Sequence, residues 1–113
     1  EHYAGAFPTW MAPVQARVLP VADAHQEYAD HVVARLEQAG FRADCIDAGD
    51  QLGKRIRAAK LEKIPYVLVV GDDDVAAGTL GVNPRGGEVE RGVGLDTFVG
   101  RLAAEVQAQQ AVR

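Results

Sequence analysis

The sequence contains a single cysteine, few aromatic residues and no long apolar run among its 113 residues. Cys45 has no partner for an internal disulfide, which is typical of a reducing compartment, and we predict no catalytic use for it. No apolar run is long enough to cross a bilayer, and no basic and then apolar signal peptide is recognised. These absences predict a cytoplasmic protein without a membrane partner.

The spacings that build metal or catalytic sites are also missing. His2, His25 and His31 show neither metal-ligand nor nucleophile spacing, so all three are interpreted as structural. The triplet Asp72–Asp74 is interpreted as a solvated loop cap, because no further carboxylate follows at the spacing of a calcium loop. The glycines between positions 78 and 87 fit turns better than a phosphate-binding loop. We therefore predict no catalytic residue, no metal site and no cofactor in this chain.

Positive charge is scarce, since the formal net charge is −4. This balance argues against unspecific binding to nucleic acid, which scales with the number of basic contacts to phosphate. One segment is an exception, because five basic residues and only one acidic residue lie between positions 52 and 63. The basic residues of this segment are Lys54, Arg55, Arg57, Lys60 and Lys63. Such a run is often only the solvated face of a helix, but its contrast with the rest of the chain also fits an anionic partner.

Apolar spacing and turn residues predict alternating strands and helices in the first 70 residues. Tyr66 to Val70 is an unbroken apolar run, typical of a central strand that is covered on both faces. Gly40 is expected at the C′ position of the first helix, and Pro65 after the end of the basic helix. The expected elements are strands at 15–21, 41–47 and 66–70, a helix at 25–39 and the basic helix. This order predicts a parallel sheet with right-handed crossovers.

The pattern changes after Gly71. Residues 72–78 leave room for only a loop or a single turn, and the turn at 84–87 separates two short strands, 79–83 and 88–93. This hairpin makes the predicted sheet mixed. Apolar residues from Leu95 to Val106 then predict a closing helix, after which residues 109–113 are expected to fray.

Three polar loops are expected to meet at one edge of this sheet. Asp23 follows the first strand, Asp47 to Asp50 the second, and Asp72 to Asp74 the third. In doubly wound sheets, ligands bind beyond the carboxyl ends of the parallel strands, and a helix N-terminus there favours a phosphate. We therefore place the expected site at this edge, beside the start of the basic helix.

The first 13 residues show no regular period, and Gly5, Pro8 and Pro13 interrupt any regular element. We expect an extended connector. Its large apolar residues, Phe7, Trp10 and Met11, are expected to lie on the domain or on a neighbouring one, because a free linker would not hold so many.

Three stretches of the sequence resemble a known family. EHYAGAFPTWMAPVQ, LGKRIRAAKLEKIPYVLVVGDDDV and VNPRGGE together resemble the C-terminal anticodon-binding domain of threonyl-tRNA synthetase, a class II aminoacyl-tRNA ligase. The likeness runs from Glu1 to about Leu102. It implies an α/β fold of three layers, α/β/α, with a mixed five-stranded sheet, and the task of recognising the anticodon loop of threonine tRNA.

The resemblance also implies how the chain is divided. Residues 1–13 would be the connector from a catalytic domain, 14–108 the anticodon-binding domain, and 109–113 a frayed end. The parent enzyme would aminoacylate threonine tRNA with ATP, Mg and a zinc ion in its catalytic domain. This chain alone would hold none of these cofactors, would not catalyse, and is expected to be a monomer.

The family's base-reading positions carry over only in part. Arg57 matches an arginine near the anticodon, and Asp74 falls where the family usually has Glu, which can accept from a guanine edge. Gly49 falls where Asn is common and Asn83 where Arg is common, while Arg85 is aligned with a second arginine of the same strand. The remaining basic residues of the helix are expected to contact tRNA phosphates at most: Lys54, Arg55, Lys60 and Lys63.

Two other interpretations stay open at this point. The chain could be a regulatory or protein-interaction module derived from such a domain, with the departures at Gly49 and Asn83 reflecting relaxed constraint. A flavodoxin-like enzyme for a small ligand is less well supported, because no glycine-rich or catalytic constellation is present.

Overall fold

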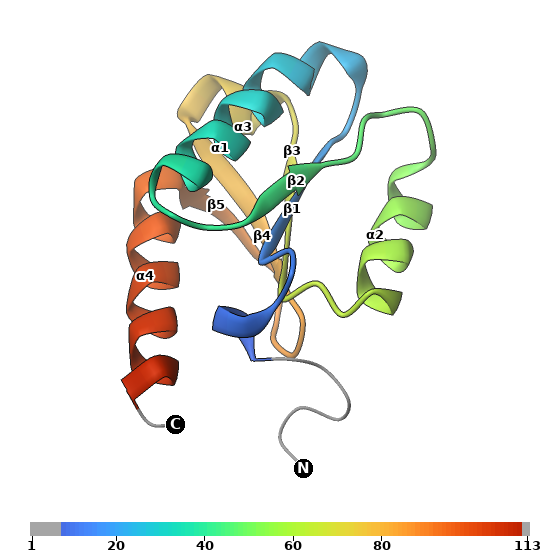
Figure 1. The fold of residues 1–113 in the computed structure, drawn as a ribbon. Helices are drawn as coiled ribbons and strands as arrows, with labels where there is room; N and C mark the ends of the chain where they lie inside the picture. The colour runs from blue at the N-terminus through green and yellow to red at the C-terminus, as the bar shows by residue number, and fades with distance from the viewer. Residues whose placement is uncertain (1–7, 112–113) are drawn as a thin grey trace.

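The computed structural model describes residues 8–111, which form five strands and four α-helices (Figure 1). The strands are β1 (Ala16–Pro20), β2 (Ala43–Cys45), β3 (Tyr66–Val70), β4 (Thr79–Pro84) and β5 (Glu90–Gly94). The helices are α1 (Gln26–Gln38), α2 (Leu52–Leu61), α3 (Asp72–Ala77) and α4 (Leu95–Ala111), with 3-10 turns η1 (Thr9–Met11) and η2 (Asp23–His25). No helix of the described part is long and apolar enough to span a bilayer.

The strands form one mixed sheet in the order β2-β1-β3-β4-β5. β1 pairs in parallel with β2 and β3, and its Val18 lies opposite Cys45 on one side and Leu68 on the other. β4 and β5 continue the sheet as antiparallel strands. The predicted mixed five-stranded sheet with β3 at its centre is therefore confirmed.

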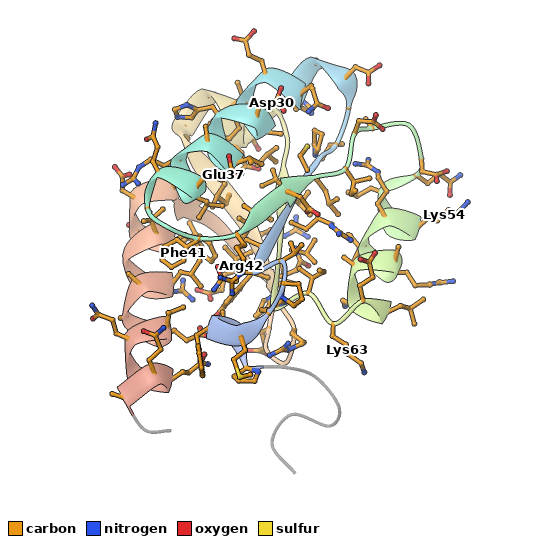
Figure 2. All side chains as sticks on the ribbon, in the orientation of Figure 1. Asp30, Glu37, Phe41, Arg42, Lys54 and Lys63 are labelled. Atoms are coloured by element: carbon orange, nitrogen blue, oxygen red, sulfur yellow. The ribbon has the colours of Figure 1, made fainter. Side chains whose placement is uncertain are left out.

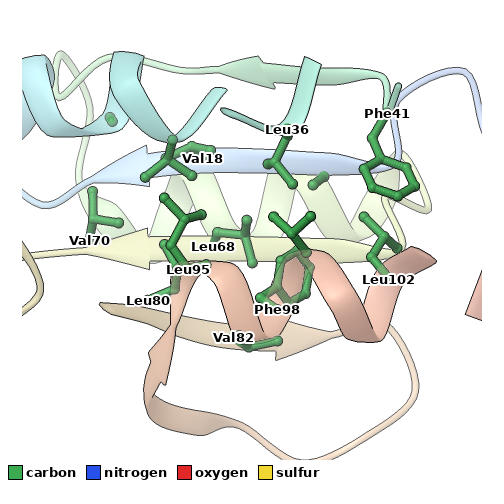
Figure 3. Close-up of a cluster of buried hydrophobic side chains, with 14 residues drawn as sticks. Val18, Leu36, Phe41, Leu68, Val70, Leu80, Val82, Leu95, Phe98 and Leu102 are labelled. Atoms are coloured by element: carbon green, nitrogen blue, oxygen red, sulfur yellow. The ribbon is translucent and has the colours of Figure 1, made fainter. Parts of the chain in front are cut away.

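Helices cover the two faces of the sheet unequally. On one face, α1 and α4 pack over Val18, Leu68 and Leu80, around Phe98 of α4 (Figure 3). On the other face α2 is the only helix within residues 8–111, and its Ala59 packs on a smaller cluster with residues of β1 and β3. Figure 1 shows α2 on the right and α4 on the left of the sheet. This arrangement confirms the predicted three layers.

Helix α1 ends as its sequence predicts. Gly40 has a φ of 92°, the Phe41 N–H donates to the Leu36 carbonyl at 3.0 Å, and Phe41 is buried against the core. This is a Schellman motif, in which a left-handed glycine lets the chain reverse and satisfies the last carbonyls of the helix.

The structure differs from the predicted elements after β3 and at β2. Residues 72–77 form a short helix rather than a loop or single turn, since the Asp74 carboxylate accepts from the Gly71 N–H at 3.1 Å and the left-handed Gly78 ends the helix. β2 has three residues instead of seven, because Phe41 leaves the strand pattern to fill the core. β5 begins at Glu90 instead of position 88.

The segment before β1 is held on the domain by polar contacts. The Thr9 hydroxyl donates to Glu105 of α4, and the Trp10 N–H donates to Gln109 Oε1 at 3.0 Å. Arg42, labelled beside this segment in Figure 2, donates to the carbonyls of Trp10 and Ala12, both at 2.9 Å. Gln109 belongs to α4, which runs to Ala111, and the fraying predicted for residues 109–113 stays a prediction.

The large apolar residues of this segment are placed differently. Trp10 is half-buried on this domain, whereas Met11 is 48% exposed, which leaves for Met11 only the predicted contact with a neighbouring domain. Phe7 lies outside the described residues.

Candidate nucleic-acid interface

A groove of about 950 Å³ runs along the sheet face that carries α2. α2 packs over β1 and β3, so no helix of the described residues covers the face of β4 and β5 beside it (Figure 1). The groove is lined by Val21, Leu52, Ile56, Val69, Gly71, Asp73, Asp74, Ala77, Thr79, Gly81, Asn83, Val89, Arg91 and Gly92. It is an open cleft with apolar walls and a few polar groups, a composition that is typical of ligand-binding sites.

Alternate residues of β4 form the floor of this groove. Leu80 and Val82 point into the main core, so Gly81 and Asn83 point to the opposite face, because side chains alternate along a strand. A Cβ atom at Gly81 would lie 3.3 Å from the Val69 carbonyl oxygen. Because glycine has no side chain, a ligand in the groove can approach the backbone of β4 closely at this position.

Helix α2 forms one wall of the groove. Leu52 and Ile56 line it, and the helical period places Arg57 and Lys60 on the same flank. Both cations are exposed, and neither has a hydrogen-bond or ion-pair partner within residues 8–111. Two unpaired positive side chains thus stand beside the mouth of the groove.

Two predicted phosphate contacts lie at the ends of α2. Figure 2 shows Lys54 and Lys63 with their side chains pointing away from the sheet. Lys54 is 3.7 Å from the exposed Asp50 carboxylate. An exposed pair of this kind contributes little stability, so Lys54 can exchange Asp50 for another anion.

Asp74, one of the predicted base-reading residues, lines the far end of the groove and is half-buried. One carboxylate oxygen accepts from the Gly71 N–H, and the other accepts from the Thr79 hydroxyl at 2.7 Å. A carboxylate offers about four acceptor positions. Asp74 therefore keeps capacity for a ligand N–H while its own orientation is fixed.

Internal contacts join the three strand-end loops, which were predicted to meet at one edge of the sheet. The buried His25 accepts from the Ala22 N–H through Nδ1 at 3.1 Å, and its Nε2 lies 2.6 Å from Asp72 Oδ1. Because Nδ1 accepts, the proton is on Nε2 and is donated to Asp72. This bond joins the loop after β1 to the start of α3, in agreement with the structural role predicted for His25.

Arg55 requires a correction. It was expected to contact phosphates, but it is only 5% exposed. Its Nε donates to the Asp50 carbonyl at 2.9 Å and its Nη1 donates to the Pro20 carbonyl at 2.8 Å. Arg55 therefore fixes the loops after β1 and β2, and its guanidinium is unavailable to an RNA.

Gly49 and Arg85, also predicted as site residues, do not line the groove. Gly49 borders a separate depression together with Asp23, Gln26, Asp30, Cys45 and Asp47. Its N–H donates to Asp47 at 3.1 Å. Arg85 donates through Nη1 to the Lys63 carbonyl at 3.0 Å, which ties β4 to the end of α2.

The depression around Gly49 is acidic and would repel phosphates. Burial is the main cause that raises the pKa of the Cys45 thiol there, so the thiol is protonated at neutral pH. Within residues 8–111, no group of three or more His, Cys, Asp or Glu side chains is placed to hold a metal ion.

Sequence reasoning missed the cation that lines the groove. Arg91 of β5 forms part of the wall opposite α2. The signal was present, because a glycine inside a strand, here Gly92, often marks a bulge that redirects its neighbour.

Comparisons with known proteins show the family of this chain. The sequence model of a family described as "Anticodon binding domain" matches residues 15–105. A threonine–tRNA ligase from Nocardioides is 43% identical over 112 residues, and one from Listeria monocytogenes is 48% identical over 107 residues. These alignments cover 99% and 94% of the chain but only 17% of each relative, so the chain spans about a sixth of their length.

Solved structures show the same fold. The RNA binding domain of threonyl-tRNA synthetase from Cryptosporidium parvum superposes with a TM-score of 0.83 at 26% identity, over 92% of this chain and 26% of that one. Prolyl-tRNA synthetase from the same organism has a TM-score of 0.80 at 18% identity, over 92% of this chain and 22% of that one, and so supports the fold alone.

Proposed function

Because this chain belongs to the anticodon binding domain family, we propose that it recognises the anticodon loop of threonine tRNA as part of a threonine–tRNA ligase. The parent enzyme would carry out ATP-dependent aminoacylation in a separate catalytic domain, with its Mg and zinc. The observation that carries the proposal is the groove beside α2, with two unpaired cations at its mouth.

The groove suits single-stranded RNA. Bases in a loop can be splayed out, stacked on side chains and read along their polar edges. The apolar walls, among them Leu52, Ile56 and Val69, offer surfaces for the faces of bases. The carboxylate of Asp74 and the amide of Asn83 offer acceptors and a donor for base edges.

The distribution of charge also favours the groove as the side on which RNA binds. The chain is acidic overall, and the depression near Gly49 is lined by three aspartates. The exposed cations Arg57, Lys60 and Lys63 belong to α2 and the turn that follows it. A polyanion would therefore be steered to the groove side and away from the acidic edge. We assign Arg57, Asp74 and Asn83 to bases, and the lysines Lys54, Lys60 and Lys63 to phosphates.

The segment 1–13 has a proposed role as well. We propose that it connects this domain to the catalytic domain, and the contacts of Thr9 and Trp10 with α4 support a firm attachment. Such contacts would limit the orientations that the domain can adopt relative to the rest of the enzyme.

One observation favours the alternative of a protein-interaction module. Leu61, at the end of α2, is 77% exposed. A single exposed leucine is common on protein surfaces, so we rank this alternative second.

A filter-binding titration tests the proposal. We expect the chain to bind threonine tRNA at least tenfold more tightly than the same tRNA with an exchanged anticodon, since one lost polar pair with a base costs about 1–3 kcal/mol. Arg57→Ala should weaken the cognate complex selectively. Lys63→Ala should weaken both complexes alike and lower the salt dependence. Equal affinity of the unmodified chain for the two tRNAs would contradict the proposal.

A further inference from the structure

β5 contains a bulge that faces the groove. Leu80 lies opposite Val93, and Val82 lies opposite Glu90, so the single residue Gly81 of β4 faces two residues of β5. The two residues are Arg91 and Gly92. Gly92 has a φ of 68°, the left-handed conformation that glycine adopts in a common type of bulge.

The bulge determines where Arg91 points. Glu90 pairs with Arg101 of α4 at 2.7 Å, and Val93 packs on the main core, so both side chains face α4. In a regular strand, residues three apart face opposite sides. The extra residue lets Glu90 and Val93 share one face, and it places Arg91 and Gly92 on the other, where both line the groove.

Arg91 is also electrostatically distinct. It is exposed, has no hydrogen-bond or ion-pair partner in the described part of the chain, and is the one cation among the residues that line the groove. Asp73 and Asp74 line the same groove. These carboxylates disfavour a phosphate inside the groove, whereas a neutral base with its own N–H groups is compatible with them.

We infer that Arg91, held in the groove by the bulge of β5, is a specificity-determining residue that reads a splayed guanine of the bound RNA. An arginine fork donates to the O6 and N7 acceptors of guanine in parallel, and no other base presents that pair of acceptors on one edge. This inference rests on the proposed function, because it assumes that a single-stranded loop enters the groove.

The experiment measures dissociation constants for an anticodon stem-loop of threonine tRNA and for one with an exchanged anticodon. Arg91→Ala should weaken the cognate complex about tenfold to a hundredfold and change the exchanged complex less than twofold. Arg91→Lys should not restore binding, because an ammonium lacks the planar fork. Arg35→Ala, which removes an arginine from α1 on the opposite face of the sheet, is the matched control and should leave both affinities unchanged.

A modified RNA locates the contact on the base. Replacing the anticodon guanine by 7-deazaguanine removes the N7 acceptor, so the unmodified chain should lose affinity while Arg91→Ala loses no more. Thermal unfolding of Arg91→Ala should match that of the unmodified chain, since the side chain is exposed and unpaired.

Three results would overturn the inference. The first is cognate affinity of Arg91→Ala within twofold of the unmodified chain. The second is equal weakening of both complexes with rescue by Arg91→Lys, which would make Arg91 a phosphate contact. The third is additive loss from the variant and the 7-deaza substitution. Failure of the proposed function looks different, because the unmodified chain itself would then bind both loops equally.

Discussion

At the scale of single residues, Arg17 and Arg55 show how charges are accommodated inside a small domain. Arg17 of β1 is 7% exposed and donates to both carboxylate oxygens of Asp44 at 2.9 Å and to Glu62 at 2.8 Å. Hydrogen bonding to Asp44 leads the causes that raise its pKa. Arg55 instead uses backbone carbonyls. Fully bonded guanidinium groups can be buried, and here they fix α2 and its flanking loops to the sheet.

Tyr66 supplies a pH-dependent test of the contacts between β3 and α4. Its hydroxyl donates to Glu105, which also accepts from Thr9. Burial, followed by this hydrogen bond, raises the pKa of the Tyr66 phenol. Because the folded pKa lies above the unfolded value of about 10, the stabilisation is complete below about pH 10 and is lost as the pH rises further.

We therefore expect Tyr66→Phe to lower the free energy of unfolding by about 1.5–3 kcal/mol at pH 7, through the lost bond to a charged acceptor. The difference from the unmodified chain should shrink above pH 10. Urea unfolding of both proteins between pH 7 and pH 11 measures it. A difference that stays constant or grows above pH 10 would contradict this account of Tyr66.

At the scale of elements, the end of α2 places a residue other than glycine in the left-handed backbone conformation. Lys63 occupies the C′ position with a φ of 64°, and the Ile64 N–H donates to the Ala59 carbonyl at 3.1 Å. This Schellman motif usually has glycine at C′, because a side chain is strained in the left-handed region.

Lys63→Gly should therefore raise the free energy of unfolding by about 0.5–1 kcal/mol, with the gain limited by the greater freedom of glycine in the unfolded chain. Lys63→Ala keeps the strain and serves as the control for loss of charge. Both variants lose the same cation, so they should weaken RNA binding equally. A Lys63→Gly protein no more stable than Lys63→Ala would show that the cap carries no strain.

Elements with local signals were predictable from the sequence, whereas the groove was not. β3 and the end of α1 at Gly40 are determined by residues that are close together in the sequence, so the sequence alone predicts them. The three-residue length of β2 and the helix at 72–77 depend on the burial of Phe41 and on bonds from Asp74. Arg55 and Arg57 sit two apart on one basic helix, and only the packing of α2 shows that the first is buried and the second exposed.

The orientation of Arg91 at the bulge of β5 could also be predicted from the sequence only in part. Gly92 inside the strand indicates a bulge, but the face that Arg91 occupies also depends on how β5 pairs with β4, which only the assembled sheet shows. The family resemblance supplied five base-reading positions. Asp74 and Asn83 line the groove and Arg57 flanks it, whereas Gly49 and Arg85 do not line it.

At the scale of the whole molecule, the two faces of the sheet are divided between stability and recognition. α1 and α4 cover one face and hold most of the buried apolar residues. In the part of the chain that the structure describes, the other face carries only α2, which leaves the sheet open over β4 and β5. The loops at the carboxyl ends of the parallel strands are held by hydrogen bonds to neighbouring elements, so internal contacts position the loops that border the groove.

Amide chemical shifts of the ¹⁵N-labelled chain, recorded during a titration with the threonine anticodon stem-loop, test most directly whether RNA binds in the groove. We predict that the largest shifts occur at Leu52, Gly71, Gly81 and Gly92 and along α2, while the amides of α1 and the outer side of α4 change little. Shifts centred on α1 and the acidic depression at Gly49, or none at stem-loop concentrations that saturate the filter-binding signal, would contradict the claim that the groove reads the anticodon.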